Sequence, residues 1–138
     1  MDKFWVGILI GLVVAAVGFY LINGSGDKQS ITGATAENLN KENMKTFFLT
    51  GANLRFFSNG VESPELRVKQ GDSVRIEFAS TDGFHDWVLD EFNASTNRVG
   101  AGASSSVEFV ADKKGTFEYY CSVGQHKANG MKGVFIVE

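Results

Sequence analysis

The sequence predicts an all-β domain, a sandwich or a barrel, preceded by one membrane-spanning helix and a flexible linker. The first observation is the uneven spread of apolar residues, which make up 16 of the 19 residues at 4–22, 4 of the 21 at 23–43 and 39 of the 95 at 44–138. The second is that the last part alternates apolar and polar residues in short runs separated by turn residues, as half-buried strands do. A chain of 138 residues has room for one modest domain.

Residues 1–22 are expected to form an N-terminal membrane anchor, that is, a signal-like segment that is not cleaved. The run 4–22 has no charge and no proline, and as a helix it would extend about 28 Å, close to a hydrocarbon core of ~30 Å. Aromatic residues near both ends, such as Trp5 and Tyr20, suit the two membrane interfaces. A cleaved secretory signal is the alternative, but its apolar region would be only about 7–15 residues long and would end in a small-x-small cleavage site.

Residues 23–43 are expected to form a flexible linker. They are rich in Gly, Ser, Thr and Asn, and Ile31 and Leu39 are the only large apolar residues among them. Such a segment cannot bury enough apolar surface to offset the entropy lost on ordering. If unstructured, it would have an r.m.s. reach of roughly 25 Å, so the domain that follows would remain near the membrane.

Residues 44–138 are expected to form the folded domain. Alternation is clearest where Val74, Ile76 and Phe78 alternate with polar residues, and it recurs at 116–121. Ten phenylalanines in these 95 residues supply a large aromatic core. Short strands at regular spacing are typical of a sandwich or a barrel. The candidate strands are 46–50, 54–58, 65–69, 73–79, 87–90, 106–110, 116–121 and 134–137.

Cysteine and histidine are scarce, because the chain has one cysteine and two histidines. One cysteine excludes an intrachain disulfide framework, a Cys₄ zinc site and an ordinary iron–sulfur cluster. Two histidines exclude a metal site with three histidines. A net charge of −3 disfavours a nucleic-acid-binding protein, which would carry a basic stripe.

The residues that could bind a metal fall into one pattern. Cys121, His126 and Met131 have the spacing C-x₄-H-x₄-M between the last two predicted strands, and His85 lies at the edge of another strand. One thiolate, two imidazoles and a weak thioether are the ligands of a mononuclear blue-copper centre. Taken singly, each residue would more often be a buried thiol, a packed histidine or a core methionine. The copper interpretation is favoured because it uses the only cysteine and both histidines together.

On these residues the domain resembles the cupredoxins, the small blue-copper proteins of the plastocyanin and azurin type. The spacing C-x₄-H-x₄-M is also similar to that of rusticyanin. The resemblance covers residues 44–138 and is most specific at 115–138. It implies a Greek-key β-sandwich that transfers single electrons through one copper ion, which cycles between Cu(I) and Cu(II). It also implies the copper ligands: His85, Cys121, His126 and, in the axial position, Met131.

One position departs from the family pattern. The residue after the first histidine is often an asparagine that hydrogen-bonds toward the residue after the cysteine, and here these two residues are Asp86 and Ser122. A carboxylate close to copper would favour Cu(II) and lower the reduction potential. Near the second histidine, Phe84, Val123, Gly124 and Ala128 are expected to form either a small apolar patch that admits electrons or ordinary loop packing.

The expected function is that of a membrane-tethered type 1 copper protein, not an enzyme. It would carry single electrons between unidentified redox proteins on the extracytoplasmic side of a cell membrane, either periplasmic or extracellular, and would bind neither nucleic acid nor a small-molecule substrate. A copper carrier or storage module with the same site is the alternative. Multicopper oxidases and nitrite reductases need more histidines than this chain has, and a binuclear centre needs a second cysteine. A nucleophilic Cys121, with His126 as base and Asp86 as orienting group, would leave His85 and Met131 without roles.

Overall fold

The computed structural model describes residues 44–138. The expected membrane anchor (1–22) and linker (23–43) lie outside the described residues, so both stay predictions. Between residues 44 and 138, no helix has the length and apolar character needed to cross a membrane.

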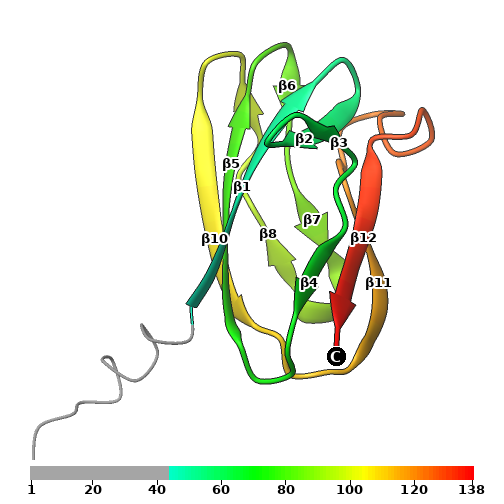
Figure 1. Ribbon diagram of the computed structural model, residues 1–138. Helices are drawn as coiled ribbons and strands as arrows, with labels where there is room; N and C mark the ends of the chain where they lie inside the picture. The colour runs from blue at the N-terminus through cyan, green and yellow to red at the C-terminus, as the bar shows by residue number, and fades with distance from the viewer. Residues whose placement is uncertain (1–43) are drawn as a thin grey trace, which may run out of the picture. The chain divides into compact units, whose positions relative to one another are not determined.

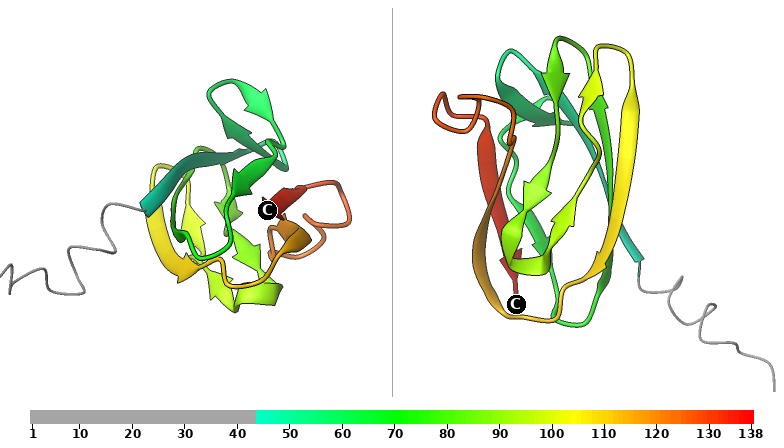
Figure 2. Two further views of the ribbon diagram at one scale, coloured as in Figure 1. Left: turned by 60° about the horizontal axis from the view of Figure 1, so that its bottom comes forward. Right: turned by 180° about the vertical axis from the view of Figure 1, so that it is seen from behind.

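The described chain forms two five-stranded sheets that face each other, together with a small two-stranded sheet (Figures 1 and 2). The first sheet has the order β10-β5-β1-β2-β3, the second has the order β4-β12-β11-β7-β8, and the small sheet pairs β6 with β9. The expected β-sandwich is therefore confirmed. The strands of the first sheet are β1 (Met44–Ala52), β2 (Arg55–Ser58), β3 (Val61–Glu62), β5 (Ser73–Ser80) and β10 (Ser104–Val110). Those of the second are β4 (Leu66–Val68), β7 (Val88–Leu89), β8 (Ala94–Ser95), β11 (Gly115–Tyr120) and β12 (Lys132–Val137), and the remaining elements are β6 (Phe84–His85), β9 (Val99–Gly100) and the 3₁₀ turn η1 (Asp90–Phe92).

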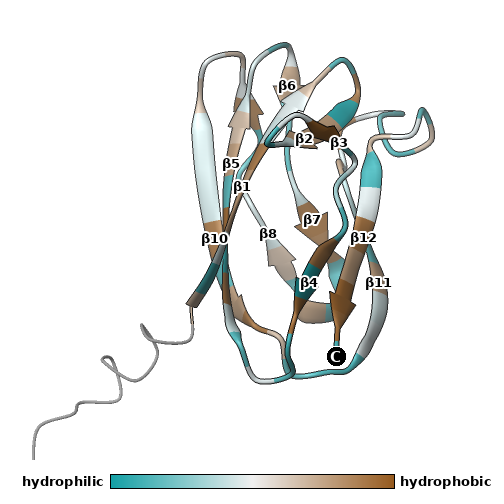
Figure 3. Ribbon diagram, in the orientation of Figure 1, coloured by the Kyte–Doolittle hydropathy of each residue, from teal (hydrophilic) through white to brown (hydrophobic). Residues whose placement is uncertain are grey.

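The eight predicted strand segments are all strands in the structure, as β1, β2, β4, β5, β7, β10, β11 and β12. Strand β5 shows why the pattern is informative: Val74, Ile76 and Phe78 are buried, and the residues between them are only half-buried. Because side chains alternate between the two faces of a strand, this pattern places one face in the core. In Figure 3 the strands accordingly carry both hydrophilic and hydrophobic residues along their length. The strands β3, β6, β8 and β9 were not predicted, because two residues are too few to show a period. Strand β7 is equally short and was found only as part of the longer predicted segment 87–90.

Aromatic side chains fill the space between the two sheets. The ring of Trp87 stacks on that of Tyr119 with a centroid distance of 5.8 Å, and Phe56 meets Tyr119 edge-on at 5.2 Å. The hydroxyl of Tyr119 donates a hydrogen bond to the carbonyl oxygen of Pro64 at 2.5 Å, so the one polar atom of this buried ring has a partner. Gly133 on β12 makes room for the ring, because a Cβ atom there would overlap it.

Two segments far apart in the sequence meet at one end of the sandwich. Residues 80–86 leave the end of β5 and enter β6, while residues 121–131 form the loop between β11 and β12. Figure 2 shows this loop, in orange, projecting beyond the strands that it joins. The packed core therefore holds both segments at the place where the predicted ligands must meet.

Candidate metal centre

The loop of residues 121–131 closes on itself through backbone hydrogen bonds. The N–H of Cys121, its first residue, donates to the carbonyl oxygen of Met131, its last, at 3.1 Å. The N–H of Met131 donates to the oxygen of His126 at 2.9 Å, and that of His126 donates to the oxygen of Val123 at 3.0 Å. The loop thus carries its cysteine, histidine and methionine in one compact turn.

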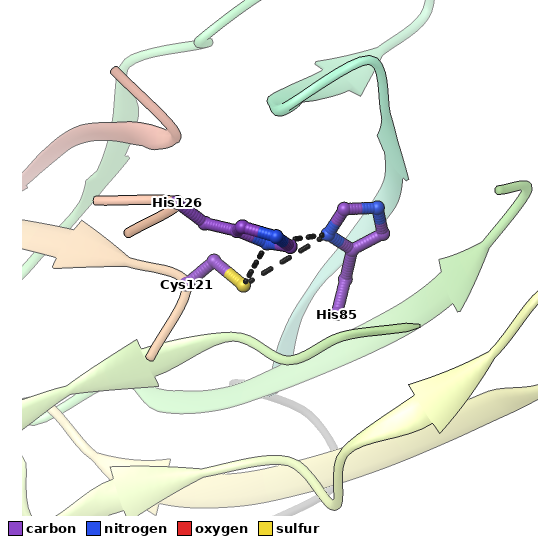
Figure 4. Close-up of side chains that lie close together, drawn as sticks. All are labelled: His85, Cys121 and His126. Atoms are coloured by element: carbon purple, nitrogen blue, oxygen red, sulfur yellow. Dashed lines mark hydrogen bonds between the residues drawn. The ribbon is translucent and has the colours of Figure 1, made fainter. Parts of the chain in front are cut away.

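The structure brings Cys121, His126 and His85 together (Figure 4). The Nδ1 atoms of the two histidines lie 3.2 Å apart. The sulfur of Cys121 lies 3.5 Å from Nδ1 of His126 and 3.9 Å from Nδ1 of His85. Cys121 is fully buried and His85 is 2% exposed, whereas His126 is half-buried. Three of the four predicted ligand residues therefore form one cluster, with His126 nearest to solvent.

The spacing of these three donor atoms suits a single metal ion. Metal–nitrogen bonds of about 2.0–2.1 Å and metal–sulfur bonds of about 2.3 Å place donors around one ion roughly 3.3–3.8 Å apart. The observed separations of 3.2, 3.5 and 3.9 Å fall close to this interval. The donors are also the right kind for copper, since thiolate suits Cu(I) and imidazole suits both oxidation states.

Met131 is fully buried at the same end of the sandwich. A Cβ atom placed on Gly51 of β1 would lie 3.0 Å from the terminal methyl of Met131 and 3.2 Å from Cβ of His85. The same atom would lie 2.8 Å from Cζ of Phe78. The end of the methionine side chain and His85 thus both pack against this glycine, so that Met131 borders the cluster.

A carboxylate contacts the far side of the His85 ring. One oxygen of Asp82 lies 2.8 Å from Nε2 of His85, and its other oxygen accepts a hydrogen bond from the N–H of Asn53 at 2.8 Å. The Asn53 N–H, and after it His85, hold the pKa of Asp82 below its ordinary value. The carboxylate is therefore ionised at neutral pH.

A second carboxylate joins the two segments of the site. Asp86 accepts hydrogen bonds from the N–H of Ser122 at 2.6 Å and from its hydroxyl at 2.5 Å. The residue after the first histidine thus contacts the residue after the cysteine, as the family resemblance implied. The guanidinium of Arg98 lies 4.0 Å from the same carboxylate and offsets part of its charge.

Burial favours the neutral forms of the two titratable side chains on the loop, the protonated thiol of Cys121 and the unprotonated imidazole of His126. Burial raises the pKa of the Cys121 thiol, because a thiolate without a partner is costly in an apolar environment. Burial, and then the proximity of His85, lowers the pKa of His126. A neutral imidazole is ready to bind a metal, whereas metal binding must displace the proton of the thiol.

An open pocket of about 470 Å³ lies beside His126. Of the predicted apolar patch, Phe84 and Val123 line this pocket, and Phe84 is 63% exposed. Gly124 and Ala128 are exposed but do not line it. The lining residues are Asn53, Leu54, Asp82, Gly83, Phe84, His85, Val123 and His126.

Three residues that support the site were not singled out from the sequence. Asp82 and Gly51 lay outside the predicted strands, and Arg55 lay within the predicted strand 54–58. The guanidinium of Arg55 donates to the carbonyl oxygen of Asn129 in the ligand loop at 2.7 Å. Each of these residues acts on a segment far from it in the chain, and a single sequence does not show such pairings.

A β-sandwich with a buried cysteine and two histidines at one end has the architecture of a cupredoxin. Residues 50–138 match the family described as copper binding proteins of the plastocyanin/azurin type, and the chain belongs to this family. Membership confirms the expected cofactor, a single type 1 copper ion, and the donors at this end of the sandwich fit it.

The curated relatives that the chain matches are larger proteins. The copper-containing nitrite reductase of Neisseria gonorrhoeae is 32% identical over 93 residues, which are 59% of this chain and 24% of the reductase. That of Alcaligenes xylosoxydans xylosoxydans is 29% identical over 102 residues, or 64% of this chain and 30% of the reductase. The chain thus spans less than a third of the length of these enzymes.

Solved structures of similar fold are small copper proteins. Reduced auracyanin from Roseiflexus castenholzii has a TM-score of 0.57 and 26% identity, with 67% of this chain and 96% of that chain covered. Rusticyanin from Thiobacillus ferrooxidans has a TM-score of 0.59 over 70% of this chain and 78% of its own. At 20% identity, the second similarity shows the shared fold alone.

Proposed function

We propose that the protein is an electron carrier that holds one copper ion between His85, Cys121, His126 and Met131. The observation that carries the proposal is the cluster of three donor atoms, 3.2 to 3.9 Å apart, at the buried end of a cupredoxin sandwich. When bound, copper supplies a one-electron couple between Cu(I) and Cu(II). The residues around it determine how fast and at what potential that couple operates.

The protein contributes a rigid, largely dry donor set. The backbone hydrogen bonds of the ligand loop and the link between Asp86 and Ser122 hold the donors in place without help from a metal. A donor set that is already in position needs little rearrangement when its charge changes, and this favours rapid electron transfer. Burial of Cys121 excludes water and protects the thiol from oxidation.

His126 provides the route to a redox partner. It is the most exposed of the three clustered residues and lies at the pocket that Phe84 and Val123 also line. An apolar rim around a half-buried imidazole suits brief contact with another protein, because such a contact expels little tightly bound water. Electrons would enter and leave through this edge.

We further propose that the protein is anchored to a membrane, with the copper domain on the extracytoplasmic side. The support is the uncharged run 4–22 and the polar segment that follows it. Cell fractionation should find the full chain with the membranes, and protease added to intact cells or spheroplasts should digest the copper domain. Recovery of the chain in the soluble fraction, or protection of its domain, would contradict this part of the proposal.

An enzymatic role is disfavoured by the ligand count. The relatives that match are copper-containing nitrite reductases. In this chain, both histidines belong to the single cluster with Cys121. No histidine is left to bind a second copper. A copper carrier with the same site differs from an electron carrier in releasing its metal.

The direct experiment is to add Cu(II) to the purified full chain in detergent and record its visible spectrum. An intense thiolate-to-copper band is expected, and it should vanish in Cys121→Ser but persist in the matched variant Ser122→Ala. Repeated reduction and oxidation should leave the copper bound in the presence of a chelator. A colourless protein, or colour that survives Cys121→Ser, would refute the site, while ready loss of copper would favour the carrier.

A further inference from the structure

We propose that Asp82 is a positioning residue of the copper site, which orients the His85 ring and, as a fixed negative charge, favours Cu(II) and lowers the reduction potential. This inference rests on the proposed role of His85 as a copper ligand. It concerns a residue that lies outside the ligand set and outside the link between Asp86 and Ser122.

The two ring nitrogens of His85 face different groups. Nδ1 faces the cluster, 3.2 Å from Nδ1 of His126 and 3.9 Å from the sulfur of Cys121, while Nε2 lies 2.8 Å from the carboxylate of Asp82. An ionised carboxylate only accepts hydrogen bonds, so Nε2 must carry the proton and donate it. In the neutral ring, Nδ1 is then unprotonated and directs its lone pair into the cluster. The carboxylate therefore selects the tautomer that can bind a metal through Nδ1.

The carboxylate is itself held in position. Its second oxygen accepts the N–H of Asn53 from the turn between β1 and β2. The hydroxyl of Ser80 donates to the backbone oxygen of Asp82 at 2.7 Å, and the N–H of Thr81 donates to the oxygen of Gly51 at 3.0 Å. Both carboxylate oxygens and the adjoining backbone are thus engaged. Such an arrangement fixes the His85 ring before any metal arrives.

The two carboxylates beside His85 have different effects. Asp86 directs both oxygens to Ser122 and has Arg98 nearby, so its charge is partly offset. Asp82 directs one oxygen to the ring of a ligand and is 47% exposed, so it keeps its charge without a large desolvation cost. A hydrogen bond from an imidazole to a carboxylate makes the other ring nitrogen a stronger donor. A stronger donor stabilises the more highly charged Cu(II) relative to Cu(I).

The test compares two variants of the full chain with a matched control. Asp82→Asn removes the charge but keeps an acceptor oxygen, and Asp82→Ala removes both. Cu(II) affinity is expected to fall roughly 10- to 100-fold in Asp82→Ala, with a smaller loss for Cu(I), so the reduction potential should rise. Each tenfold change in the ratio of the two affinities is about 59 mV for one electron. Asp82→Asn should show a rise in the same direction.

The control is Asp72→Asn. Asp72 precedes β5, whereas Asp82 follows it. The carboxylate of Asp72 accepts a hydrogen bond from the N–H of Lys69 at 2.9 Å. Asp72 therefore resembles Asp82 in accepting a backbone N–H beside β5, but it lies at the opposite end of the strand. The potential of this variant should equal that of the wild type. If Asp72→Asn shifts the potential as much as Asp82→Asn, the effect is one of general surface charge and the inference is overturned.

A second measurement needs no copper. The ¹⁵N chemical shifts of the His85 ring in the copper-free protein should show the proton on Nε2, and Asp82→Ala should weaken this preference. A proton found on Nδ1 in the wild type would overturn the inference even if the protein binds copper. A wild type that stays colourless with Cu(II) contradicts the proposed function instead. Blue protein in which Asp82→Asn and Asp82→Ala leave the potential unchanged contradicts the role of Asp82 alone.

Discussion

The two segments that supply the donor atoms, residues 121–131 and residues 80–86, are held in place by different kinds of contact. The loop 121–131 is braced mainly by backbone hydrogen bonds between its own residues. The segment 80–86 is braced mainly by residues that are distant in the chain, through the contacts of Thr81 with Gly51 and of Asp82 with Asn53. The first segment can hold its shape locally, whereas the second depends on the packing of β1 and β2 against it. Changes at the long-range contacts of residues 80–86 should therefore affect His85 most. The four predictions below compare the two segments and are ordered by expected effect.

The largest effect is expected for Asp86→Ala, which cuts the contact between the two segments. Two charge-assisted hydrogen bonds to Ser122 are lost, and the N–H of Ser122 is left without this partner. The free energy of unfolding of the copper-free protein should fall by about 3 kcal/mol, as measured by urea denaturation. Ser122→Ala removes only the hydroxyl bond and should cost about 1.5 kcal/mol, the lower end for hydrogen bonds to charged groups. A loss in Asp86→Ala no larger than that in Ser122→Ala would show that the bond from the Ser122 N–H contributes nothing, and no loss in either variant would show that the segments are not joined by this carboxylate.

The next effect is expected for Gly51→Ala, because the new methyl would meet the side chains of Phe78, Met131 and His85. Overpacking of this kind should cost about 2 kcal/mol, and the visible spectrum of the copper form should change because both His85 and Met131 must shift. Gly133→Ala is the control, since its methyl would overlap Tyr119 in the core instead. It should destabilise the fold but leave the spectrum of the folded protein as it was. An unchanged spectrum in Gly51→Ala would place this glycine outside the site.

A smaller effect is expected for Arg55→Ala, which removes the guanidinium contact with the oxygen of Asn129. Arg55 is 35% exposed, so the loss should be about 1.5 kcal/mol, at the lower end for charged hydrogen bonds. Amide hydrogen exchange should quicken at residues 125–130 and change little at 80–86. Arg67→Ala, which removes exposed ion pairs with Glu65 and Glu138, should change neither segment. Equal quickening in both segments would mean that they open as one unit.

The smallest effect on stability is expected for Met131→Leu, because this exchange nearly conserves side-chain volume. The free energy of unfolding should change by less than about 1 kcal/mol. The blue colour should remain, and the reduction potential should rise because a donor to oxidised copper is lost. Met44→Leu, at the start of β1, is the control and should leave the potential unchanged. A potential that does not move in Met131→Leu would remove Met131 from the axial position.

Prediction from the sequence succeeded where the signal is local. Strand β5 shows a period of two over eight residues, and Cys121, His126 and Met131 are recognisable because one short loop carries them at regular spacing. It failed for β6, which contains only Phe84 and His85, because two residues cannot display a period. His85 entered the predicted ligand set because it is one of only two histidines in the chain and because the family resemblance implied it, not because of a pattern around it.

By itself, the sequence predicted the class of the fold, the copper ion and the candidate donors, because hydropathy, turn residues and ligand chemistry are properties of residue types and their order. Only the tertiary structure decided what surrounds those donors. It brought Nδ1 of His85 to 3.2 Å from Nδ1 of His126, 41 residues away, and placed Asp82 behind the same ring. The physical reason is that such contacts depend on how two sheets pack and how their end loops turn. In the sequence, Asp82 does not differ from other aspartates in turns, and only the packing shows that it contacts His85.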